Sequence, residues 1–133
     1  MKHWIQAARL RTLPLSVSGI IVGSFYAMSQ ALFNWSIVIL ALLTTLGFQV
    51  LSNFANDYGD GIKGTDNEDR VGPKRTIQSG VISPKQMKNA LIITSLLTLF
   101  SAIALIYVAF KDHNLLFSFI YLLLGILAIG SAI

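Results

Sequence analysis

The sequence predicts an all-α fold, a polytopic membrane helix bundle with about four transmembrane helices. Of the 133 residues, 54% are hydrophobic and only 12% are charged, about half the charged share of an ordinary soluble domain. Three stretches contain no Asp, Glu, Lys or Arg: residues 12–56, 89–110 and 113–133. Each can supply at least one span, because a membrane-crossing helix needs about 20 apolar residues. Cysteine is absent, which excludes disulfides, thiolate metal sites and cysteine nucleophiles.

Polar breaks between the apolar runs divide residues 1–133 into helices of one domain. The first uncharged stretch is too long for one span, and its most polar point is residues 29–36. Ser83, Pro84 and Gln86 have the pattern of a capping box with proline in the first turn, which predicts a helix start. The expected helices therefore lie near residues 13–28, 35–56, 84–110 and 115–133, with a charged loop at 57–83.

Gly19 and Gly23 stand four residues apart within the first expected helix. This GxxxG spacing lets helix backbones approach closely in membranes. We expect the two glycines to pack against another helix of the same chain, with dimerisation as the alternative.

The positive charges predict how the helices are oriented. Three Lys or Arg residues precede the first helix, four lie in the loop at 57–83 and two more in the first turns of the third helix, whereas the turn after the first helix has none. Basic segments next to membrane helices stay in the cytoplasm, so the N-terminus and residues 57–88 are expected there, in a multi-pass protein of the inner (plasma) membrane. Contact with lipid thus explains the net charge of +4 without a nucleic-acid partner. The alternative, a cleaved signal peptide over residues 1–31, fits less well because further apolar runs follow.

A ladder of polar side chains runs along the end of the second expected helix. Gln49, Asn53, Asn56, Asp57 and Asp60 are spaced so that they share a helix face. Polar groups within a membrane are costly and usually line a cavity or meet a partner. Two carboxylates one turn apart suit Mg²⁺, which commonly takes one or two carboxylates plus substrate phosphates. A solvated helix end is the alternative, but it would not require the upstream amides.

The following loop combines acidic and basic residues. Asp66 follows the first two aspartates, and Arg70, Lys74 and Arg75 come shortly after. Acidic ligands for a metal beside bases for phosphate oxygens are what a metal–diphosphate complex requires. A mixed-charge cytoplasmic loop without a ligand has the same composition and remains the alternative.

Four segments of the chain, taken in order, resemble a known family. The segment NFANDYGD at 53–60 resembles the first aspartate-rich motif, NDxxD, of the UbiA-type intramembrane prenyltransferases. The segments ARLRTLP at 8–14, KGTDN at 63–67 and VGPKRTIQSG at 71–80 are similar to the dihydroxynaphthoate prenyltransferase branch, which acts in menaquinone biosynthesis. Leu10 departs from the branch, which often has proline there, and Gly64 occupies a position where the superfamily often has a third aspartate.

The resemblance implies transfer of a polyprenyl group from polyprenyl diphosphate to 1,4-dihydroxy-2-naphthoate, which gives demethylmenaquinone. It implies that Mg²⁺ is the cofactor, with Asp57 and Asp60 as its catalytic ligands and Asp66 as a third candidate. Asn56, Arg70, Lys74 and Arg75 would bind the diphosphate. Asn53 and Arg11 would contact substrate.

Members of this family are longer and have a second aspartate-rich motif in their C-terminal half. The chain contains no acidic residue after Asp112, so we expect it to be an N-terminal part that needs the C-terminal half for a complete site and is inactive alone. Two other functions remain open. The acceptor could be 4-hydroxybenzoate or homogentisate, or the chain could be a non-enzymatic membrane protein or transporter fragment whose polar ladder conducts ions.

The predicted orientation is tested by labelling single cysteines with a membrane-impermeant reagent in intact cells. Asn67→Cys lies in the expected cytoplasmic loop and should react only after the inner face is exposed. Asn34→Cys, in the uncharged turn, is the matched control and should react from outside. Labelling of Asn67→Cys in intact cells would contradict this topology.

Overall fold

A computed structural model describes residues 2–63, 76–110 and 115–132, and nearly all of them are helical. A short helix, α1 (Lys2–Ala8), is followed by a 3₁₀ turn, η1 (Leu10–Thr12), and three long helices. These are α2 (Leu13–Ser29), α3 (Trp35–Lys63) and α4 (Pro84–Phe110), and α5 (Leu115–Ala132) comes last. Within the described residues there is no strand, which confirms the predicted all-α class.

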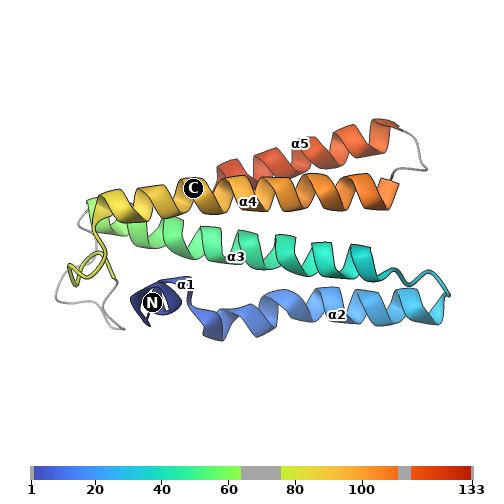
Figure 1. Ribbon diagram of the computed structural model, residues 1–133, viewed down its shortest axis with the longest axis horizontal. Helices are drawn as coiled ribbons and strands as arrows, with labels where there is room; N and C mark the ends of the chain where they lie inside the picture. Colours follow the sequence, from blue (N-terminus) through green and yellow to red (C-terminus); the bar gives the residue numbers. More distant parts are fainter. Residues whose placement is uncertain (1, 64–75, 111–114, 133) are drawn as a thin grey trace.

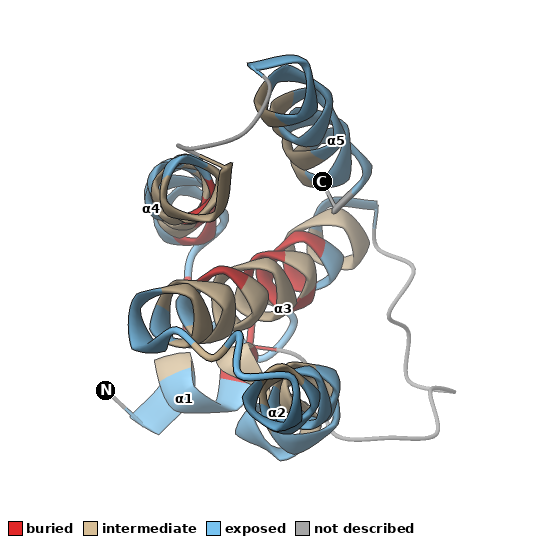
Figure 2. Cartoon of the chain, turned by 90° about the vertical axis from the view of Figure 1, so that its right-hand side faces the viewer, coloured by how far each residue is buried: buried red, intermediate tan, exposed pale blue. Residues whose placement is uncertain are grey.

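Helix α3 is the centre of the arrangement (Figures 1 and 2). It packs most extensively against α4, and it also contacts α1, α2 and α5. Helix α5 packs mainly on α4. Helix α1 is seen end-on in Figure 1 while the long helices run across the picture, so it lies across their direction at one end of the bundle. It covers α3 near Phe54, where its Trp4 and Ala7 side chains pack.

Most large apolar side chains point outward from the bundle. Leu15 on α2 is 81% exposed and Leu115 on α5 is 84% exposed. The segments Lys2–Ser29, Trp35–Lys63 and Pro84–Phe110 are long and apolar enough to cross a membrane, and Leu115–Ser131 is apolar but shorter. Exposed hydrophobic surface of this extent is stable in lipid rather than in water. The protein is therefore a multi-pass membrane protein.

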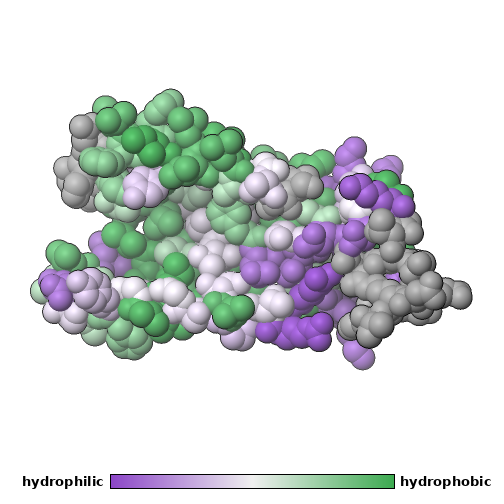
Figure 3. Space-filling model, turned by 180° about the vertical axis from the view of Figure 1, so that it is seen from behind, coloured by the Kyte–Doolittle hydropathy of each residue, from purple (hydrophilic) through white to green (hydrophobic). Residues whose placement is uncertain are grey.

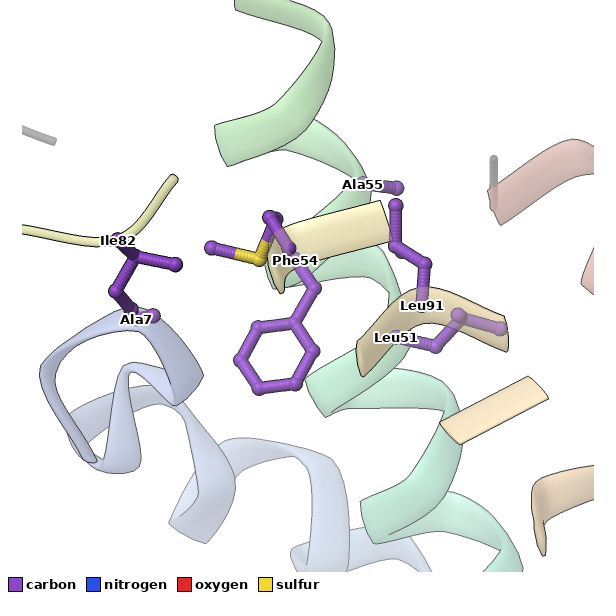
Figure 4. Close-up of a cluster of buried hydrophobic side chains, with 7 residues drawn as sticks. Ala7, Leu51, Phe54, Ala55, Ile82 and Leu91 are labelled. Atoms are coloured by element: carbon purple, nitrogen blue, oxygen red, sulfur yellow. The ribbon is translucent and has the colours of Figure 1, made fainter. Parts of the chain in front are cut away.

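A small hydrophobic core lies near the end of the bundle that carries α1 (Figure 4). The Trp4 and Phe54 rings meet in an edge-to-face contact with 5.7 Å between their centroids. Hydrophilic side chains gather at this same end of the molecule (Figure 3). The core joins α1, α3, α4 and the turn before α4, and it consists of Ala7, Leu51, Phe54, Ala55, Ile82, Met87 and Leu91.

The start of α4 agrees with the boundary predicted from the sequence, whereas the end of α3 does not. The capping box of α4 is confirmed, because the Ser83 amide donates to Gln86 Oε1 at 2.9 Å and the Gln86 amide donates to Ser83 Oγ at 3.2 Å. Helix α3 instead continues to Lys63, beyond the expected end at Asn56. Its last turns are held by tertiary contacts, since a Cβ built at Gly61 would overlap Ile77.

Close helix approach occurs at a different glycine from those predicted. No described atom lies within 4 Å of a Cβ built at Gly19 or Gly23, outside their own helix, so the expected packing there is not found among the described residues. At Gly47 on α3, an added Cβ would overlap Thr98 Oγ1 on α4. Nearby, the Thr44 and Ser101 hydroxyls lie 2.9 Å apart across the same interface. Small and hydroxyl-bearing residues thus join α3 to α4, as is common within membranes.

We predict that Gly47→Ala destabilises the protein by about 1–3 kcal/mol, because overpacking a close contact forces neighbouring atoms apart. Thermal unfolding in detergent measures the effect. Gly19→Ala is the matched control and should be neutral or slightly stabilising, since alanine favours helix and open space surrounds the site. Equal stability of the two variants would contradict the packing at Gly47.

Candidate functional site

The buried carboxylate of Asp57 is bound from two sides at the polar end of α3. Its Oδ1 lies 3.3 Å from Nη2 of Arg9, and the two side chains are 3% and 29% exposed respectively. Its Oδ2 accepts hydrogen bonds from Thr76 Oγ1 at 2.7 Å and from the Thr76 amide at 3.4 Å. A buried charge requires such partners, because removal from water is costly. Asp57 therefore joins the N-terminal region, α3 and the turn before α4.

The N-terminal region makes a second contact with α3 one turn earlier. The buried side chain of Asn53 donates through Nδ2 to the Ala8 carbonyl at 2.9 Å. Arg9 has a left-handed backbone, with φ of 51°, which costs a non-glycine residue about 1–2 kcal/mol. Its carbonyl accepts from both the amide and the hydroxyl of Thr12 at 2.9 Å. We call the paired contacts Ala8–Asn53 and Arg9–Asp57 the N-terminal clasp.

Thr76 is fixed by the turn in which it lies. Its carbonyl accepts hydrogen bonds from the amides of Val81 and Ile82, each at 3.2 Å, and from Ser79 Oγ at 3.1 Å. Gly80 has a positive φ of 71°, a conformation that glycine adopts without steric cost. The turn thus presents the Thr76 hydroxyl and amide together to Asp57.

The structure brings only some of the predicted site residues together. Asn53 and Asp57 are the two α3 residues of the N-terminal clasp. Asp60 is half-buried on the next turn of α3. Asn56 is exposed on α3 and Arg11 is exposed on η1. The remaining candidates lie outside the described residues: Asp66, Arg70, Lys74 and Arg75.

Sequence reasoning missed Arg9 and Thr76 as contacts of the site. Both lie in segments already singled out by their resemblance to the prenyltransferases, ARLRTLP and VGPKRTIQSG. No local pattern pairs them with Asp57, from which they are 48 and 19 positions distant. Both could have been proposed from one argument: a carboxylate buried at the end of a membrane helix needs donors, and few basic or hydroxyl residues are expected at the same membrane face.

An open hollow of about 470 Å³, lined mainly by hydroxyl and amide side chains, lies beside α3 before the site; we call it the polar hollow. Gln49, one turn before Asn53, lines it and accepts a hydrogen bond from Ser16 Oγ at 2.5 Å. Of the predicted polar ladder, Gln49 lines this hollow, whereas Asn53 is bound to the Ala8 carbonyl and Asn56 is exposed. The lining of the hollow comes from α2, α3 and α5 and consists of Ser16, Thr45, Phe48, Gln49, Ser52 and Ser131.

The donor set of the described residues is compatible with Mg²⁺. Asp57 and Asp60 are separated by three positions on one helix, and Mg²⁺ often takes two protein carboxylates and completes its shell with phosphates and water. The part of the chain that the structure describes has no group of three or more His, Cys, Asp or Glu placed to hold a metal.

A helical membrane bundle with an aspartate pair at its polar end is the arrangement expected of an intramembrane prenyltransferase. The model of the UbiA prenyltransferase family matches residues 16–132, and the chain belongs to this family. No solved structure matches the chain.

Three curated relatives share one name, 1,4-dihydroxy-2-naphthoate octaprenyltransferase. The Haemophilus influenzae protein is 47% identical over 136 aligned positions, covering 100% of this chain and 43% of the relative. The Escherichia coli protein is 47% identical over 130, covering 98% of this chain and 42% of the relative. The Mycobacterium tuberculosis protein is 38% identical over 88, covering 66% and 30%. The chain therefore spans less than half the length of these relatives.

We predict that Thr76→Val lowers the free energy of unfolding by about 1.5–3 kcal/mol, the usual contribution of a hydrogen bond to a charged group. Thr76→Ser retains the hydroxyl and should remain near the unsubstituted stability. Thermal unfolding in detergent compares the two. If valine and serine behave alike, the hydroxyl does not support the buried carboxylate.

Proposed function

We propose that the protein containing this chain transfers a polyprenyl group from polyprenyl diphosphate to 1,4-dihydroxy-2-naphthoate. The observation that carries the proposal is the position of Asp57 and Asp60, at the polar end of a helix that is long and apolar enough to cross a membrane. A substrate with a charged head and a hydrocarbon tail matches that division, because each part would meet a surface of its own polarity. The names of the relatives support this choice of donor and acceptor.

Asp57 and Asp60 would hold Mg²⁺, with Asp66 as a third ligand. When bound, the ion supplies positive charge that stabilises the departing diphosphate. Asn56, Arg70, Lys74 and Arg75 would donate hydrogen bonds to the phosphate oxygens, and charge-assisted bonds of this kind are the strong ones. The site would lie on the cytoplasmic face of the inner membrane, where the basic loop is expected.

The polar hollow would receive the naphthoate. Its hydroxyl and amide groups match the hydroxyls and carboxylate of such an acceptor, while Phe48 offers an aromatic face. Arg11 and Asn53 would contact substrate at the mouth of the site. The prenyl tail would extend between the helices toward lipid, where its large apolar surface is favourably solvated.

The metal ligands are tested by Asp57→Asn and Asp60→Asn in the protein expressed from its complete gene. Each should reduce Mg²⁺-dependent turnover by roughly 100-fold or more, a common cost of removing a group that stabilises transition-state charge. Prenylated product is measured by mass spectrometry with octaprenyl diphosphate and dihydroxynaphthoate.

Asp112→Asn makes the same chemical change at an aspartate that is not among the proposed ligands and serves as the control for general effects of charge loss. Near-normal turnover of either Asp57→Asn or Asp60→Asn would remove the proposed metal site. Parallel reactions with 4-hydroxybenzoate and homogentisate test the acceptor, and a faster reaction with either would overturn the choice of naphthoate.

A further inference from the structure

We infer that Arg9 is a positioning residue for Asp57, so that the N-terminal clasp belongs to the diphosphate-binding site. The inference rests on the proposed function. It adds a residue that acts through the aspartate, and it assigns a role to the segment before the first long helix.

The first support is the burial of the ion pair. Exposed ion pairs contribute little, but the Asp57 side chain is only 3% exposed while that of Arg9 is 29% exposed. Loss of Arg9 would leave the buried carboxylate without this cationic partner, which is strongly unfavourable. Arg9 at Oδ1 and Thr76 at Oδ2 together fix how the carboxylate plane is turned about its bond to Cβ.

The second support is the geometry of the N-terminal clasp. Adjacent residues, Ala8 and Arg9, bind Asn53 and Asp57, which are one turn apart on α3. Two contacts of matching spacing hold the segment in one register, whereas a single contact would permit it to pivot. Arg9 also has a left-handed backbone, and local strain of this kind often accompanies functional positions.

The experiment measures binding of Mg²⁺ with inorganic diphosphate by titration calorimetry, using the protein expressed from its complete gene. Arg9→Gln and Arg9→Gly should each weaken binding about tenfold or more, the usual effect of removing a residue that orients a metal ligand. Glycine adopts the left-handed backbone without strain, so weaker binding by Arg9→Gly cannot be attributed to backbone strain. Arg9→Lys retains the charge and should recover binding to within about threefold.

Two comparisons separate positioning from other roles. Lys2→Gln removes a charge from an exposed position of α1 and should bind like the unsubstituted protein. In an Asp57→Asn background, Arg9→Gln should cause no further loss, because the arginine would act only through that carboxylate. If Arg9→Gln cannot be isolated folded, the glycine and lysine variants provide the same comparison.

The outcomes distinguish the two proposals. If the unsubstituted protein does not bind Mg²⁺ with diphosphate, the proposed function is wrong and the inference falls with it. If it binds and Arg9→Gln and Arg9→Gly bind equally well, only the inference is overturned. An undiminished effect of Arg9→Gln in the Asp57→Asn background would mean that Arg9 contacts diphosphate directly, which also overturns a positioning role.

Discussion

The arrangement of this chain depends on burying one negative charge at the end of a membrane helix. Asp57 is almost inaccessible to water, and it receives donors from Arg9 on one side and Thr76 on the other. The same segments also meet in the small hydrophobic core, which joins α1, α3, α4 and the turn before α4. The charge therefore specifies which segments surround it, since segments without suitable donors would leave it unpaired. Apolar packing in the core favours association of the segments, but it does little to determine which segments associate.

The spans were readable from the sequence because charge is excluded from hydrocarbon. Runs without Asp, Glu, Lys or Arg predicted the four apolar helices, and the Ser83–Gln86 pattern predicted where α4 begins, which the structure confirms. The membrane class and the family also followed from the sequence. Local rules sufficed for these features, because each depends on residues close together in the chain.

Features that depend on distant contacts were not predictable in this way. The sequence suggested that the second long helix ends near Asn56, but packing of Gly61 against Ile77 accompanies two further turns. Gly19 and Gly23 had the expected spacing for close packing, whereas Gly47 makes the close approach because Thr98 lies opposite. At the candidate site, the aspartates were recognised from a motif, but the partners of Asp57 became visible only once the helices were assembled.

The position of Asp57 between its two partners has a consequence for biosynthesis. Arg9 precedes it by 48 residues and Thr76 follows it by 19, so Asp57 leaves the ribosome after its first partner and before its second. Most of the hydrophobic core that packs on α1 is also translated later than α1 itself. Its members from later in the chain include Phe54, Ile82, Met87 and Leu91. The N-terminus, although synthesised first, can dock completely only after the beginning of α4 leaves the ribosome. Emergence of the early helices from the ribosome thus precedes completion of the site, because the contacts of Asp57 with Thr76 form only after the turn before α4 has also emerged.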